Sequence, residues 1–76
     1  MQRYHYTDYQ VNTIVNVFHF GQPDQMKVIG HDHDRRLVKL QYMVPEFGID
    51  FKDVETLNRM SEQCHQYEQR KSKSKV

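Results

Sequence analysis

Cysteine is almost missing from this sequence, which has only Cys64 among its 76 residues. A single thiol cannot form a disulfide within the chain, and it excludes the structural zinc sites that need two or four cysteines. A reducing, cytoplasmic setting is therefore the simplest prediction.

Long apolar runs are absent as well. No stretch approaches the ~20 apolar residues that a membrane-spanning helix needs. The first ten residues, MQRYHYTDYQ, are polar and lack the apolar centre of a signal peptide. We therefore expect no membrane association. The length suits one small domain with a small core, for which a partner or a second copy is a common source of extra stability.

The chain also lacks a strong overall charge, since its formal net charge is +1. Residues 1–69 carry seven Lys or Arg and ten Asp or Glu, a net of −3, whereas residues 70–76 (RKSKSKV) carry four positive charges and no acid. A nucleic-acid-binding domain usually spreads basic residues over its folded surface. We predict a single domain over residues 1–69 and a flexible basic tail over residues 70–76.

The C-terminal half predicts a loop followed by a helix over about 51–70. Pro45 and Gly48 interrupt regular structure, and Asp50 is suited to cap the start of a helix. Apolar side chains then recur at helical spacing. They are Val54, Leu57, Met60, Cys64 and Tyr67.

A β-hairpin is predicted before this helix, with strands at about 25–30 and 36–44. Apolar and polar residues alternate in both segments, as expected for strands with one buried face. The inward set comprises Met26, Val28, Val38, Leu40, Tyr42 and Val44. The intervening Gly30-His31-Asp32-His33-Asp34 is rich in turn-forming residues.

The segment over about 8–20 is ambiguous. Thr7 and Gln10 match a capping box, the apolar residues from Val11 to Phe18 recur at helical spacing, and Gly21 suits a helix end. Five of the seven residues from 11 to 17 are β-branched, which instead favours a strand. We favour the helix and keep a third strand as the alternative, within a small α+β domain in which the C-terminal helix packs on the hairpin.

The sequence HDHD at residues 31–34 raises the question of metal binding, because His31 and His33 share one face of an extended segment. No paired cysteines, HExxH pattern or spaced third ligand supports a metal site. An exposed hairpin tip is convex and wet, so it is poorly suited to acid–base catalysis. We predict neither an enzyme nor a cofactor, interpret HDHD as a polar turn, and keep a metal-binding module as an alternative.

Cys64 falls on the apolar face of the predicted helix, which favours a buried structural thiol over a nucleophile. We expect contact with partners to involve exposed arginines and an aromatic cluster where the hairpin meets the helix, which includes Phe51. The predicted protein-binding residues are Arg35, Arg36, Tyr42, Met43 and Phe47.

The leading hypothesis is a small, non-catalytic, intracellular protein-interaction or regulatory protein, of the kind that phages and plasmids use to modulate or inhibit host machinery. It would bind a protein partner, or form a homodimer through a sheet edge or the last helix. Nucleic-acid binding is the alternative. Its residues would be Arg35, Arg36 and Lys39 on the hairpin, and Arg70, Lys71, Lys73 and Lys75 at the C-terminus.

Overall fold

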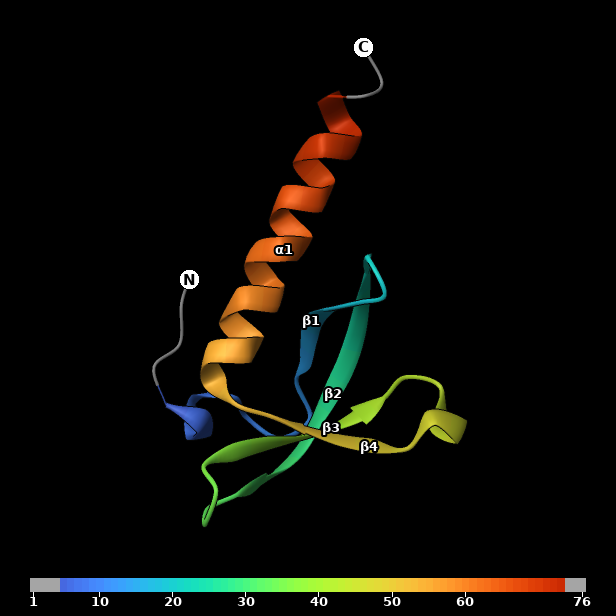
Figure 1. Ribbon diagram of the computed structural model, residues 1–76. Coiled ribbons are helices and arrows are strands. Elements are labelled where there is room, and N and C mark those ends of the chain that lie inside the picture. Colours follow the sequence, from blue (N-terminus) through green and yellow to red (C-terminus); the bar gives the residue numbers. More distant parts are fainter. Residues whose placement is uncertain (1–4, 74–76) are drawn as a thin grey trace.

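The computed structural model describes residues 5–73, with side chains up to residue 70. Four antiparallel strands form one sheet in the order β1-β2-β3-β4, and one helix crosses a single face of it (Figure 1). The elements are η1 (Tyr6–Asp8), β1 (Ile14–His19), β2 (Gln22–Asp32), β3 (Leu37–Tyr42), η2 (Pro45–Phe47), β4 (Ile49–Lys52) and α1 (Val54–Lys73). The predicted α+β class, hairpin and C-terminal helix are confirmed.

The core lies between α1 and one face of the sheet. Directly opposed residues of antiparallel strands share a face, so the pairs Val28–Leu40 and His31–Val38 place alternate residues of β2 and β3 toward the helix. The buried side chains on this face are Val17, Met26, Val28, Val38 and Leu40, with Leu57 contributed by α1 and Tyr6 and Tyr9 by the N-terminal segment. The predicted alternation is therefore confirmed for Met26, Val28, Val38 and Leu40, and Tyr42 is partly buried. The inward placement of Val44 was wrong, because it lies beyond β3 and is exposed.

The opposite face of the sheet has no helix over it, and we call it the open face. It carries Ile14 and Asn16 from β1, Gln25 from β2, Lys39 and Gln41 from β3, and Ile49 and Phe51 from β4. Ile14, Ile49 and Phe51 are among the exposed large apolar side chains of the chain. In the described part of the chain, no helix is both long and apolar enough to span a membrane.

The helix favoured for residues 8–20 is wrong, and the alternative of a third strand is correct over Ile14–His19. The β-branched residues decide the outcome, because they fit a pleated surface better than a helix. Val17 packs in the core while Ile14 stays on the open face. Gly21 closes a turn with Phe20 rather than ending a helix, and Pro23 lies in β2.

β1 begins with a β-bulge that fixes which of its residues face β2. The amide of Asn12 donates to the carbonyl of Val28 (2.8 Å), and the amide of Val28 donates to the carbonyl of Thr13 (2.9 Å). Asn12 and Thr13 thus both lie opposite Val28, which defines the bulge. Asn12 adopts a φ of 75°, in the left-handed conformation that asparagine tolerates.

The helix starts three residues later than Asp50 would have placed it. Asp53 is the capping residue, and its carboxylate accepts a hydrogen bond from the amide of Thr56 (2.7 Å). Asp50 instead lies in β4, a strand that the sequence analysis did not predict. α1 also continues to Lys73, so the first residues of the predicted tail are helical. Figure 1 shows the C-terminal half of α1 projecting beyond the sheet.

We expect Asp53→Ala to lower the free energy of unfolding by about 1 kcal/mol, because the amide of Thr56 loses its acceptor. Hydrogen bonds from Thr56 hold the pKa of Asp53 below its usual value, so this stabilisation is present above that value and is lost as pH falls through the folded-state pKa. Urea unfolding between pH 7 and pH 3 measures both effects. Asp53→Asn is the matched control, because it keeps an acceptor and does not titrate; an equal loss in both variants would contradict the assignment.

Candidate functional site

A concave site lies between the β1–β2 turn and η2, at one end of the sheet. It has a volume of about 460 Å³, and we call it the aromatic slot. It is lined by His19, Phe20, Gln22, Pro23, Asp24, Tyr42 and Phe47. The slot forms because β2 extends past the end of β3: Met26 pairs with Tyr42, whereas residues 22–25 pair only with β1. Pro23 is tolerated there because its nitrogen lies on the side of β2 that has no partner strand, where no amide donor is needed.

Phe20 forms one wall of the slot and has two unfavourable properties. The pairing of His19 with Gln22 leaves Phe20 and Gly21 as a two-residue turn, and φ is positive at both (53° and 75°). Such turns favour Asn-Gly, because a bulky side chain is strained at positive φ. The phenyl ring is also fully exposed to solvent.

Tyr42 and Phe47 form the opposite wall. Their rings meet edge to face, with centroids 5.9 Å apart and planes at 88°. Phe47 is 68% exposed, and it is positioned by η2, whose last turn is closed by a hydrogen bond from the amide of Gly48 to the carbonyl of Pro45 (3.1 Å). Tyr42 and Phe47 do cluster as predicted, but they meet at η2 and not where the hairpin meets the helix. Phe51 lies away from them on the open face, so its placement in that cluster was wrong.

His19 lies within the slot, and its side chain is only 15% exposed. Its ring centroid is 5.7 Å from that of Tyr42, and its Nδ1 atom is 3.9 Å from the Asp24 carboxylate. Its Nε2 atom is buried and has no hydrogen-bond partner in the described part of the chain. A buried imidazole nitrogen without a partner is costly, so His19 is an energetically unfavourable group at the edge of the slot.

Asp24 is the acidic residue among those that line the slot. Its side chain is 53% exposed, and none of the described lining residues is Lys or Arg. Asp50 lies nearby on β4. Its partial burial opposes ionisation, but the hydrogen bond from Lys52 (3.0 Å), the amide of Phe51 and the charge of Lys52 outweigh burial and lower the pKa of Asp50. The slot is therefore apolar at its walls and negative beside them.

The predicted protein-binding residues do not form one surface. Tyr42, Met43 and Phe47 lie at the slot end of β3, and Met43 is exposed. Arg35 and Arg36 lie in the β2–β3 turn at the other end of the same strand. Because β3 separates the two groups, they cannot contact one small ligand together.

Arg35 is already engaged within the hairpin. Its Nε atom is 2.7 Å from the Asp32 carboxylate, and its guanidinium lies over the ring of Phe51, 5.1 Å from the centroid. Of the other residues in the nucleic-acid hypothesis, Lys39 lies on the open face and Arg70 lies near Phe18 and Tyr67. Lys71 and Lys73 belong to α1 but their side chains are not described, and Lys75 lies outside the described residues. The described basic side chains are thus dispersed.

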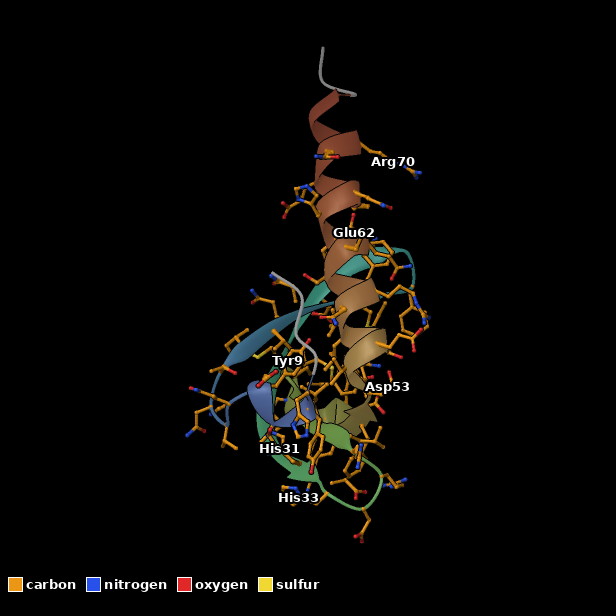
Figure 2. All side chains as sticks on the ribbon, turned by 90° about the vertical axis from the view of Figure 1, so that its left-hand side faces the viewer. Tyr9, His31, His33, Asp53, Glu62 and Arg70 are labelled. Atoms are coloured by element: carbon orange, nitrogen blue, oxygen red, sulfur yellow. The ribbon has the colours of Figure 1, made fainter. Side chains whose placement is uncertain are left out.

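The histidines of HDHD hold the N-terminal segment in place instead of standing free at a hairpin tip. The Nε2–H of His31 donates to the carbonyl of Tyr9 (2.6 Å), and the Nδ1 atom of His33 shares a hydrogen bond with the hydroxyl of Tyr6 (2.7 Å). Figure 2 shows Tyr9, His31 and His33 together, away from the C-terminal half of α1. The exposed turn that we expected at residues 30–34 lies at residues 33–36. No three metal-ligating side chains gather among the described residues.

Cys64 is buried, as predicted, and its thiol donates to the carbonyl of Val17 (3.1 Å). Burial raises the pKa of this thiol, and the nearby Glu68 raises it further. Cys64 is therefore held as a neutral thiol, which is the poorly nucleophilic form.

Five of the seven residues that line the slot were not predicted from the sequence, namely His19, Phe20, Gln22, Pro23 and Asp24. One signal was available: a Phe-Gly pair between two β-branched or alternating segments is compatible with a tight hairpin turn. We interpreted that pair as the end of a helix, and this hid the exposed ring. The position of His19 beside Tyr42 depends on strand register, which could not be obtained once residues 8–20 were treated as helical.

Comparison with known proteins identifies no relative, since no protein-family model, curated protein or solved structure matches the chain.

We expect Arg35→Gln to raise the pKa of Asp32, because the hydrogen bonds and charge of Arg35 hold that pKa below its usual value of 3.8. A lowered folded-state pKa stabilises the fold above the usual value, and the effect is lost as pH falls through the folded-state pKa. Carboxyl NMR titration measures the shift. Arg36→Gln is the control, since Arg36 forms no ion pair within the described part of the chain; equal shifts at Asp32 in both variants would contradict the pairing.

Proposed function

We propose that this chain is a small, non-catalytic protein-interaction protein that binds its partner through the aromatic slot. The partner would insert an apolar or aromatic side chain between Phe20 and the Tyr42–Phe47 pair. A Lys or Arg of the partner beside that side chain would lie against Asp24. By occupying a surface of its partner, such a protein would act as an intracellular regulator or inhibitor.

The observation that supports this proposal most strongly is Phe20. A left-handed conformation costs a non-glycine residue about 1–2 kcal/mol, and the exposed ring gains no burial within the chain. Asparagine would be favoured at this position by folding alone. Strained residues that stability does not explain are concentrated at functional sites, so we infer that Phe20 is retained for contact with a partner.

The form of the slot favours a side chain presented by a protein over an enclosed small molecule. Its volume of about 460 Å³ would accommodate one large side chain and its neighbours. Phe20 and Phe47 remain largely exposed on either side, so a partner's backbone could approach without displacing them. Aromatic side chains of this kind are enriched at the centres of protein–protein interfaces. The dispersed basic residues and the neutral Cys64 thiol supply no comparable support for nucleic-acid binding or catalysis.

Phe20→Asn tests the proposal because stability and binding should change in opposite directions. We expect the free energy of unfolding to rise by about 1 kcal/mol, since Asn-Gly suits this turn. We expect affinity for the partner to fall at least about tenfold, since one wall of the slot is lost. Arg36→Asn is the matched control, because Arg36 also has a positive φ (56°) in a hairpin turn and lies away from the slot.

The probe is a phage-displayed library of random peptides, selected on the wild-type chain. We expect enriched peptides to carry an aromatic or aliphatic residue next to Lys or Arg. Isothermal titration calorimetry of these peptides should show weaker binding to Phe20→Asn and Phe47→Ala, and unchanged binding to Arg36→Asn. Failure to enrich any consensus, or equal binding by Phe20→Asn and the wild type, would overturn the proposal.

A further inference from the structure

The two edges of the sheet differ in their protection against a further strand. β4 is only four residues long, and Asp50 and Lys52 form an ion pair along it (3.0 Å). The Asp50 carboxylate also accepts a hydrogen bond from the amide of Phe51 (2.8 Å). The amide of Tyr42 donates to the carbonyl of Gly48, so the backbone groups of Gly48, Asp50 and Lys52 point toward β3. The amide of Phe51 therefore points away from β3. A short, charged strand with an occupied amide is a poor acceptor for another strand.

β1 has none of these features, although α1 runs beside it and shares hollows with Ile14, Asn16 and Phe18. The hydrogen bond from Val28 to the carbonyl of Thr13 sets the alternation, so Val15 and Val17 face β2 while Ile14, Asn16 and Phe18 direct their amides and carbonyls outward. Those outward backbone groups have no hydrogen-bond partner among the described residues. β1, with the sequence IVNVFH, contains no proline, Lys, Arg, Asp or Glu, and Ile14 is 46% exposed. Such an edge is a template for strand addition.

We propose that β1 pairs with β1 of a second copy of this chain, antiparallel and about a two-fold axis at Asn16. In this register Ile14 lies opposite Phe18 of the second copy, Val15 lies opposite Val17, and Asn16 lies opposite Asn16. The residues that meet as hydrogen-bonded pairs are then those with outward backbone groups. Two four-stranded sheets become one continuous sheet, and each copy loses its unprotected edge.

The pairings show why a second copy is the occupant. An antiparallel strand paired with itself must be self-complementary, and β1 places an aliphatic side chain opposite an aromatic one and valine opposite valine. No charge is repeated across the axis, because β1 carries no acidic or strongly basic residue. Phe18 is already positioned by Tyr67 of α1, with ring centroids 5.9 Å apart. The aromatic slot is lined by none of the residues from Ile14 to Phe18, so this dimer does not depend on the proposed function.

Sedimentation equilibrium of the full chain between about 5 and 500 μM provides the first test, and we expect a monomer–dimer equilibrium in this range. Amide hydrogen exchange by NMR provides the second. Raising the concentration should protect the amides of Ile14, Asn16 and Phe18, whereas Val15 and Val17 should be protected at every concentration. A single-chain mass throughout, or a dimer in which the outward amides gain no protection, would overturn the proposal.

Charge substitutions on the axis test the register. Asn16→Lys places two ammonium groups opposite each other, and we expect dimer affinity to fall about tenfold or more. Asn16→Glu alone should weaken it similarly, but mixing the two variants should restore a one-to-one dimer because opposite charges then meet. Gln25→Lys is the control, since Gln25 lies directly beside Asn16 on the next strand, is also exposed, and donates a hydrogen bond to the Oδ1 atom of Asn16 (3.4 Å). Equal weakening by Gln25→Lys, or no restoration in the mixture, would contradict this register.

Failure of these tests would not affect the proposed function. A monomer that still selects peptides at the slot would retain the first proposal and lose this one.

Discussion

Burial of one sheet face beneath α1 is the interaction on which the rest of the structure depends. Leu57 of α1 is 2% exposed, and its side chain packs against a surface formed by Val17, Met26, Val28 and their neighbours. A domain of 76 residues has few such side chains, so each contributes a large share of the small net stability. The contacts that fix this packing join distant parts of the chain: the thiol of Cys64 bonds to Val17, and the hydroxyl of Tyr9 bonds to Asn58 (3.2 Å).

The same packing determines where the aromatic slot can lie. α1 contacts chiefly β1 and β2, so it does not cover the end of the sheet where β3 passes into η2. Small polar side chains at that end of the sheet would leave the edge of the core exposed to water. Instead, His19 and Tyr42 extend the packed face, and Phe20 and Phe47 stand on either side of it. The site therefore occupies the part of the buried face that a single helix is too narrow to cover.

The amino-acid sequence was sufficient for the elements whose pattern and propensity agree. Val38 and Leu40 alternate with polar residues in a β-favouring segment, and Leu57 and Cys64 recur at helical spacing in a helix-favouring one. Residues 8–20 failed because the two signals conflict: caps and spacing indicated a helix, whereas β-branching favoured a strand. β4 was missed because Asp50 resembles a helix cap and the strand is short. The slot could not be predicted, since it depends on how far β2 extends past β3, a property of register that no local pattern contains.

The order of the strands has a consequence for how the chain folds. Every strand pairs with its neighbour in sequence, so the sheet closes through short loops and loses little chain entropy at each step. Sequence-local contacts of this kind are associated with rapid folding. The backbone groups of each strand that pair with a neighbouring strand are exposed until the hairpins have formed. Because each strand pairs with its neighbour in sequence, the time during which these groups are exposed is short. α1 follows the four strands in the chain, so during synthesis the apolar face of the sheet emerges from the ribosome before the segment that covers it.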